Sequence, residues 1–254
     1  MLTRREERLL RTLRQRRTRE EEGLFLVEGV RAVEDLAASP LAVRFAVASS
    51  TLGDTPRGAA AAAALAVRGV AVHEVDERDF RDWADTETPQ GILAVAAIPR
   101  AELGAIPLAA DPAVILVLDA VQDPGNFGTL VRTAEALGAA GVVALPGTVD
   151  PWNPKSVRGA MGASFRLPVV EAEWDALEPW LRERGLAIVA SAVGAAPPAA
   201  LPRRAALVLG NEGAGVSPDT LRRADLSLGI PLRGRAESLN VAAAGAILLH
   251  ELLR

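Results

Sequence analysis

The sequence predicts an α/β protein in which a smaller N-terminal α/β domain precedes a larger C-terminal domain built on a parallel sheet. Apolar runs of strand length alternate with segments of helical periodicity along the chain. VILVLDA at 114–120 is an unbroken apolar run, which is typical of a strand inside a parallel sheet. Residues 99–113 contain three prolines and no sustained period, so they are predicted to be a linker. The predicted domains are therefore 1–98 and 114–254.

Composition excludes several classes of protein. The 254 residues are 50% hydrophobic and 24% charged, which is an ordinary globular balance. Cysteine is absent and the two histidines, His73 and His250, are far apart, so we expect no disulfide and no metal centre. No apolar run approaches the roughly 20 residues that cross a bilayer. The N-terminus has no apolar signal core. We expect a cytoplasmic protein with no membrane partner.

The N-terminal domain opens with a predicted basic helix. Leu9, Leu10 and Leu13 share one face, and the other faces are charged. Two interpretations stay open: a solvated helix that docks through its leucines, or an arm that contacts the RNA backbone. The net charge is −4, so any grip on nucleic acid has to come from a local patch. The densest patch comprises Arg11, Arg14, Arg16, Arg17 and Arg19.

The rest of the N-terminal domain alternates between helix and strand. Helices are expected at 28–38, 56–68 and 77–84, and strands at 41–48, 70–75 and 91–98. Pro56 at the first turn and Gly69 just past the end delimit the second of these helices. His73 falls on the solvent-facing phase of its strand, so we interpret it as an exposed residue and not as a ligand.

The C-terminal domain continues the alternation. Strands are expected at 114–120, 141–145, 165–170, 186–191, 205–210 and 226–230, and helices at 127–138, 154–162, 174–184, 217–224 and 239–253. Ligand sites of parallel sheets lie at the carboxyl ends of the strands. Three loops at such ends are therefore the candidates for a functional site.

The first candidate loop runs over residues 119–128 and leads into a helix that carries Arg132. Gly125 and Gly128 would permit close approach of the backbone to a ligand. Asn126 is a suitable N-cap, and the helix start would offer N–H groups to an anion. An ordinary strand–turn–helix with a surface arginine is the alternative. The loop matches neither GxGxxG nor GxxxxGK[ST], which argues against a dinucleotide or P-loop site.

The second and third loops combine glycines with polar residues. Residues 209–215, LGNEGAG, follow a strand, and glycines there indicate that backbone approaches a ligand. A glycine-rich turn with an exposed Glu212 is the alternative. Residues 229–240 enter the last helix, with Ser238 as the expected N-cap and Asn240 in the first turn. That helix is rich in small residues, which allows close packing.

These segments together resemble a known family. NFGTLVR (126–132), LVLGNEGAGVS (207–217) and IPLRGRAESLNVAAAGAIL (230–248) resemble, in order and spacing, the motifs of the SpoU-type (TrmH-like) RNA ribose 2′-O-methyltransferases of the SPOUT class. NPKSVRGAMGASFRLPV (153–169) resembles the intermediate segment of that family. FLVEGVRAVEDL (25–36) and TPQGILAV (88–95) resemble the ribosomal-protein-like RNA-binding module fused to many members. The resemblance covers nearly the whole chain.

The resemblance implies properties that the pattern alone does not. It implies a C-terminal trefoil knot that threads the last helix, about 239–253, and a homodimer with the site beside the two-fold interface. It also implies S-adenosylmethionine as cofactor, held largely through backbone groups. The implied cofactor-binding residues are Leu209, Gly210, Asn211, Gly213, Ile230, Pro231, Ser238 and Leu239.

The implied reaction is methyl transfer to a ribose 2′-hydroxyl. The implied catalytic residues are Asn126, Arg132, Glu212, Ser238 and Asn240. The family role proposed for Arg132 is to deprotonate the hydroxyl, but a guanidinium has a pKa above about 12. We therefore expect Arg132 to position a phosphate and stabilise alkoxide charge, and the base stays open. Asn126 and Asn240 would orient the ribose or Arg132, and Glu212 would hold Asn126 or Arg132. Expected RNA contacts are the five arginines of the N-terminal patch together with Lys155 and Arg158.

Three hypotheses about function remain open. The fused N-terminal module favours a large-subunit ribosomal RNA substrate, with tRNA left open. A non-catalytic RNA-binding or ribosome-assembly factor of the same fold would be favoured by loss of Arg132 or Asn126, and both are present. A nucleotide-binding oxidoreductase of ordinary doubly wound topology is disfavoured by the missing GxGxxG.

Overall fold

The computed structural model describes residues 2–195 and 200–254, and the chain divides into two compact units. Unit 1 comprises Met1–Arg100 and Trp152–Phe165, and unit 2 comprises Ala101–Pro151 and Arg166–Arg254. Met1 and residues 196–199 of the predicted domains lie outside the described residues. The segment 152–165 thus packs with the N-terminal residues, although it follows the first strands of unit 2 in sequence.

Unit 1 contains a four-stranded mixed sheet in the order β1-β4-β2-β3. Its strands are β1 Leu24–Glu28, β2 Val43–Ser49, β3 Val72–Val75 and β4 Ile92–Ala97, and its helices are α1 Arg4–Thr12, α2 Arg16–Glu22, α3 Val30–Ala38, α4 Pro56–Val67, α5 Glu77–Trp83 and α7 Pro154–Ala160. Short 3-10 turns occur at Leu52–Asp54 and Ala163–Phe165. The sequence pattern did not indicate strand β1, because all five of its residues are buried and show no alternation. The separate helix α2 was not expected either.

Helix α1 docks on the sheet of unit 1 through its leucine stripe. Leu9, Leu10 and Leu13 are at most 5% exposed and pack with residues such as Phe45 and Phe80. The docked helix also covers His73, whose side chain is only 18% exposed and lies 3.7 Å from Glu6. The expectation of a solvent-exposed His73 is therefore wrong. His73 points to the face of the sheet that α1 covers, so the side of the strand that was expected to face solvent is also packed.

Unit 2 contains a six-stranded sheet in the order β10-β8-β9-β5-β6-β7, and every strand pair is parallel. The strands are β5 Ala113–Leu118, β6 Gly141–Ala144, β7 Val169–Glu171, β8 Ala187–Ser191, β9 Arg204–Leu209 and β10 Leu226–Leu228. The helices are α6 Pro124–Leu137, α8 Trp174–Glu183, α9 Pro218–Arg223 and α10 Val241–Leu253, with a 3-10 turn at Leu103–Ala105. The predicted α/β class with a parallel C-terminal sheet is confirmed. The expected strand at 165–170 begins later, because residues 163–165 form a 3-10 turn.

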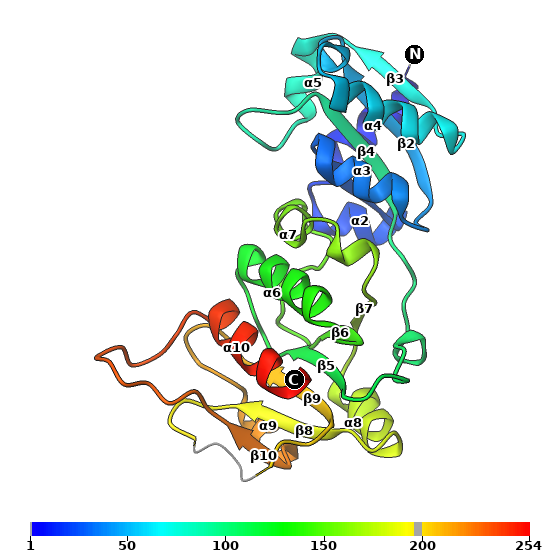
Figure 1. The fold of residues 1–254 in the computed structure, drawn as a ribbon. Helices are drawn as coiled ribbons and strands as arrows, with labels where there is room; N and C mark the ends of the chain where they lie inside the picture. The colour runs from blue at the N-terminus through cyan, green and yellow to red at the C-terminus, as the bar shows by residue number, and fades with distance from the viewer. Residues whose placement is uncertain (1, 196–199) are drawn as a thin grey trace. The chain divides into compact units, whose positions relative to one another are not determined.

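Helices cover both faces of this sheet (Figure 1). Ala206 and Val208 of β9 pack in one core with Leu177 and Leu181 of α8. The next residue of β9, Leu209, faces α10, where a Cβ on Gly245 would come within 2.6 Å of its Cδ1 atom and within 2.4 Å of Leu130 on α6. The small-residue face of the last helix therefore packs closely, as predicted. The knot that would thread α10 stays a prediction.

The order of the strands determines where loops diverge. From β5 the chain adds β6 and then β7 on one side, and it later adds β8, β9 and β10 on the other side. The reversal falls between β5 and β9, and ligands of open parallel sheets bind outside the carboxyl ends of strands at such a point. Among the described residues, no helix is both long and apolar enough to cross a membrane.

Candidate active site

A chain of hydrogen bonds joins the three candidate loops. The Glu212 carboxylate, after β9, accepts from the backbone N–H groups of Gln122 at 3.2 Å and Asp123 at 3.1 Å, after β5. It also accepts from Nδ2 of Asn126 at 3.1 Å. Asn126 in turn accepts, through Oδ1, a hydrogen bond of 3.0 Å from Nδ2 of Asn240. We call Glu212, Asn126 and Asn240 the carboxylate–amide chain.

The partners of each amide fix its orientation. Oδ1 of Asn240 accepts from the backbone N–H groups of Ala242 at 2.9 Å and Ala243 at 3.3 Å, so its Nδ2 points to Asn126. Both lone pairs of the Asn240 carbonyl are thereby used, while its Nδ2 keeps a second hydrogen. Asn126 keeps one N–H and one lone pair. Toward a ligand, Asn240 is a hydrogen-bond donor only.

The helix caps at this site differ from the predicted ones. Asp123 caps α6, its Oδ1 accepting from the N–H of Asn126 at 2.8 Å, and Asn126 lies inside the helix. Pro124 occupies the first helical position, where proline is favoured, so the cap is the residue before it. Asn240, and not Ser238, caps α10. The anion expected at the start of α6 is supplied by the protein, since Asp123 and Glu212 take the N–H groups there.

The surroundings of Glu212 favour its charged form. Burial acts to raise the pKa of its carboxyl, but hydrogen bonds from Asn126, Asp123 and Gln122 outweigh that effect. The pKa of Glu212 therefore lies below its ordinary value of 4.5. At neutral pH the residue is a carboxylate that organises its donors.

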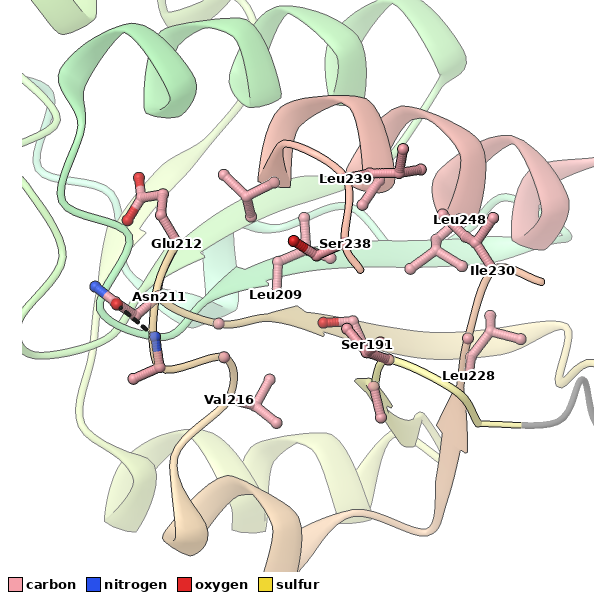
Figure 2. A pocket seen from close by; sticks show the side chains of 18 of the residues that line it. Ser191, Leu209, Asn211, Glu212, Val216, Leu228, Ile230, Ser238, Leu239 and Leu248 are labelled. Carbon is pink, nitrogen blue, oxygen red and sulfur yellow. Dashed lines mark hydrogen bonds between the residues drawn. The ribbon is translucent and has the colours of Figure 1, made fainter. Parts of the chain in front are cut away.

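Glu212, at one end of the carboxylate–amide chain, lines a cavity of about 420 Å³. Figure 2 shows this cavity. Its floor and walls come from the carboxyl ends of three neighbouring strands, β8, β9 and β10, and from α10. The predicted cofactor and catalytic residues that line it are Leu209, Gly210, Asn211, Glu212, Gly213, Ile230, Ser238 and Leu239. Pro231 lines a second cavity of about 480 Å³, which also touches Ile230. The walls are mainly aliphatic, and the polar groups are few.

One side of the cavity was missed by the sequence analysis. Ser191, Ala192 and Val193, at the carboxyl end of β8, line it. The strand itself was expected, and its neighbours β9 and β10 both carry candidate loops. The position of β8 next to β9 and β10 in the sheet would have indicated these residues, but a local sequence motif does not reveal the order of strands.

Asn211 organises the glycine-rich loop from within. Its Oδ1 accepts from the N–H groups of Gly213 and Ala214, each at 3.0 Å, and its Nδ2 donates to the carbonyl of Ala120 at 3.0 Å. Ala120 has a φ of 59°, the left-handed region, in the turn that follows β5. A Cβ at Gly210 would lie 2.0 Å from the carbonyl carbon of Gly215. Glycine is thus required at 210 by the return of this loop on itself, and not by a ligand as the pattern suggested.

Arg132 and Ser238 complete the predicted catalytic set. Ser238 lines the cavity. Arg132 is exposed on α6, six residues after Asn126 and so about 9 Å further along the helix axis. The structure therefore brings Glu212, Asn126 and Asn240 into one hydrogen-bonded chain, with Ser238 at the cavity and Arg132 on the outer surface of the same helix that carries Asn126.

The expected RNA-contacting arginines differ in their surroundings. Arg19 is 2% exposed, and its Nη1 donates to the carbonyls of Leu13 at 2.7 Å and Arg14 at 2.8 Å. Its assignment as an RNA contact is corrected: it caps the C-terminal end of α1. Arg16 and Arg17 form exposed pairs with Glu20 and Glu21, and Arg14 donates to the carbonyl of Ala84. Arg11 is exposed.

Lys155 and Arg158 lie on α7 in unit 1. Lys155 is exposed. Nη1 of Arg158 lies 2.8 Å from Asp85 and 3.8 Å from Glu28, a carboxylate that is 8% exposed. Arg158 thus compensates a buried charge, which accounts for its position without a ligand. The described residues contain no group of three or more histidine, cysteine or acidic side chains that would hold a metal ion.

Comparison with known proteins gives the following matches. A model of the SpoU rRNA Methylase family matches residues 113–250, and a model of the MRM3-like substrate binding domain matches residues 8–94. The 23S rRNA (guanosine(2553)-2′-O)-methyltransferase RlmP of Bacillus subtilis is 37% identical over 94% of this chain and 92% of its own length.

Two solved structures show the same architecture. The SpoU methyltransferase AviRb of Streptomyces viridochromogenes, in complex with AdoMet, has a TM-score of 0.86 and is 26% identical, covering 99% of this chain and 97% of its own. An AdoMet-bound rRNA methyltransferase of Sinorhizobium meliloti has a TM-score of 0.85 and is 30% identical, covering 99% and 95%. Because a family model spans more than half of its residues and the Bacillus relative matches nearly its whole length, the chain belongs to the SpoU rRNA methylase family.

Proposed function

We propose that this protein transfers the methyl group of S-adenosylmethionine to a ribose 2′-hydroxyl of large-subunit ribosomal RNA. The observation that carries the proposal is the carboxylate–amide chain beside a cavity at the carboxyl ends of β8, β9 and β10. The Bacillus relative is named as a 23S rRNA 2′-O-methyltransferase, which supports both the reaction and the RNA class.

The cavity suits the cofactor. Its volume of about 420 Å³ is within the range of small-molecule sites, and its walls combine aliphatic side chains with exposed backbone of the loops after β9 and β10. Leu209, Ile230 and Leu239 would supply shape to an adenosine, and the backbone of Gly210–Gly213 would supply polar contacts. Two neighbouring structures of the family contain AdoMet. When bound, the cofactor supplies a methyl group that its sulfonium has already activated.

The chain itself has to align the nucleophile and manage one proton. The 2′-oxygen forms a bond to the methyl carbon as the carbon–sulfur bond breaks, and the hydroxyl proton leaves. Alignment of two reactants is worth several kcal/mol of barrier, about 7–11 in favourable systems. Asn240, whose Nδ2 keeps one hydrogen, would donate to a ribose oxygen. Asn126, itself held by Glu212, and the α10 cap fix the orientation of that amide.

Arg132 is assigned a charge role. A guanidinium stays protonated at physiological pH and offers five donors, so it is suited to hold a phosphate and to stabilise negative charge on the 2′-oxygen. It is not suited to accept a proton. The hydroxyl proton would be released to solvent water.

We also propose a role for the N-terminal domain, an oligomeric state and a cellular location. Residues 1–98 would serve as the RNA substrate-binding domain, and the match to a substrate-binding family model supports this role. Arg11 of this domain and Lys155 of α7 would be exposed contacts. A cytoplasmic homodimer is proposed, in which the exposed Ile247 of α10, 42% accessible, and Leu239, 39% accessible, would be covered by the partner. Threading of α10 through a knot belongs to the same proposal.

The test is a map of ribose methylation in a strain that lacks the gene. The expected result is loss of one 2′-O-methyl group from large-subunit ribosomal RNA, restored by the wild-type gene and not by an allele that encodes Arg132→Ala. Loss of a methyl group from tRNA alone would replace the ribosomal substrate with tRNA. Unchanged methylation of all RNA would overturn the proposed activity.

A further inference from the structure

The segment between β10 and α10 differs from the rest of unit 2 in its arginines. Every residue from Pro231 to Asn240 is exposed. Arg233 and Arg235 lie in this segment, and within the described part of unit 2 they are the only arginines without a hydrogen bond or ion pair to another residue. Most of the others are held by carboxylates or carbonyls, as Arg203 is by Asp111 at 2.8 Å. Two cations are therefore left for an external partner.

The segment is anchored to the cavity at both ends. Ile230 and Leu232 line the cavity on the β10 side, and Ser238 and Leu239 line it on the α10 side. Between these anchors the chain projects away from the sheet, as the orange segment between β10 and α10 in Figure 1 shows. Arg233 and Arg235 therefore lie on an exposed segment whose two ends line the cavity, within seven residues of Asn240 in the carboxylate–amide chain.

We propose that Arg233 and Arg235 bind backbone phosphates of the RNA next to the nucleotide that is methylated. This inference rests on the proposed function, because it needs an RNA substrate at this cavity. Arginine is suited to phosphate, which accepts two parallel N–H hydrogen bonds from its planar fork. Glu212 already adds a fixed carboxylate to the cavity, so unpaired cations on the segment that borders it favour approach of a polyanion that the net charge of −4 would otherwise repel.

A second anion, the carboxylate of the cofactor, is an alternative partner for Arg233 and Arg235. The two partners differ in their dependence on salt. Each phosphate contact on single-stranded RNA contributes about 0.7 to the slope of log affinity against log salt, so at 0.1 M salt one contact is worth about fivefold relative to 1 M. A contact with the single carboxylate of a small cofactor gives no such polyelectrolyte effect. Loss of that contact would lower the affinity for the cofactor even in the absence of RNA.

The experiment compares three variants of the full-length protein, Arg233→Gln, Arg235→Gln and the doubly substituted protein, with a matched control, Arg203→Gln. Arg203 is exposed and immediately precedes β9, at the amino end of the strand and so away from the cavity at its carboxyl end. RNA affinity is measured against salt with a fragment of unmethylated ribosomal RNA, and cofactor affinity is measured by calorimetry without RNA. A further variant with lysine at both positions, Arg233→Lys with Arg235→Lys, restores the charge.

The proposal predicts about a fivefold loss of RNA affinity for each glutamine variant at 0.1 M salt, a slope lower by about 0.7 per variant, and unchanged cofactor affinity. The lysine protein should recover the slope, and Arg203→Gln should behave as wild type. Wild-type slopes in both glutamine variants would overturn the proposal, and so would a loss of cofactor affinity, which would assign the arginines to the cofactor. Failure of the wild-type protein to methylate any RNA would instead contradict the proposed function.

Discussion

The carboxylate–amide chain makes a sharp prediction for Asn126→Asp. Asparagine and aspartate have nearly the same shape, so the substitution keeps the acceptor for Asn240 and exchanges only Nδ2 for an oxygen. That oxygen then faces Oε1 of Glu212 across the present 3.1 Å. A hydrogen bond is replaced by two carboxylates in contact, and the variant should be destabilised at neutral pH.

The size of the effect follows from that distance. Two unit charges 3.1 Å apart repel by about 1 kcal/mol at a dielectric constant of 80 and about 5 kcal/mol at 20. The site is partly exposed, so we expect a value toward the lower end. The repulsion is relieved when one carboxyl takes up a proton, and it raises an apparent pKa of the pair by roughly one unit for each 1.4 kcal/mol. The deficit should therefore shrink as the pH falls from 8 toward 5.

The stability that Glu212 contributes to the wild-type protein changes with pH in the opposite direction. The pKa of Glu212 is lowered in the folded state, so its contribution is present above the ordinary value of 4.5 and is lost as the pH falls below it. Urea unfolding of the full chain at several pH values, followed by tryptophan fluorescence, separates the two profiles. Asn126→Ser is the matched control, because it removes the amide without adding charge. If Asn126→Asp loses as much stability at pH 5 as at pH 8, the hydrogen bond to Glu212 is not as described.

Three further predictions address other parts of the site and the fold. Arg132→Ala should abolish methyl transfer and leave cofactor affinity, measured by calorimetry, nearly unchanged, since Arg132 lies on α6 away from the cavity; near-normal turnover would exclude a catalytic role. Arg19→Met should lower the free energy of unfolding by about 3 kcal/mol, because one buried and one partly buried carbonyl lose a charged donor, whereas Arg17→Met should change the urea midpoint little; equal effects would refute the cap assignment. Gly210→Ala should weaken cofactor binding at least tenfold, because its Cβ would overlap the backbone of Gly215, and a wild-type calorimetric titration would show that the loop can open at no cost.

Much of the architecture could be predicted from the sequence, and its local errors have physical causes. The unbroken run at 114–120 and the alternation that follows it indicated the parallel sheet correctly. Strand β1 was missed because Leu24–Glu28 is buried on both faces, and its short apolar run, Leu24–Val27, has no period that distinguishes strand from helix. The cap of α6 was misplaced by three residues, although Pro124 marked the first helical position.

The site shows the same division between local and tertiary information. Glu212, Asn126 and Asn240 were singled out from three separate loops, and they form one hydrogen-bonded chain. The sequence did not distinguish Arg19 from Arg17 because both lie in one charged stretch, and only docking of α1 buries the former. Ser191 and its neighbours were missed because their place in the cavity depends on the order of strands. Residues 152–165 look continuous with the C-terminal motifs but pack in unit 1.

The central claim is that the product is a 2′-O-methylated ribose, and alkaline hydrolysis tests it most directly. Purified protein is incubated with methyl-labelled S-adenosylmethionine and ribosomal RNA from a strain that lacks the gene, and the RNA is then digested in alkali. Alkaline cleavage needs a free 2′-hydroxyl, so a 2′-O-methyl group protects the adjoining phosphodiester bond. We predict that the label remains in an alkali-resistant dinucleotide. Label recovered in mononucleotides would place the methyl group on a base and would contradict the account.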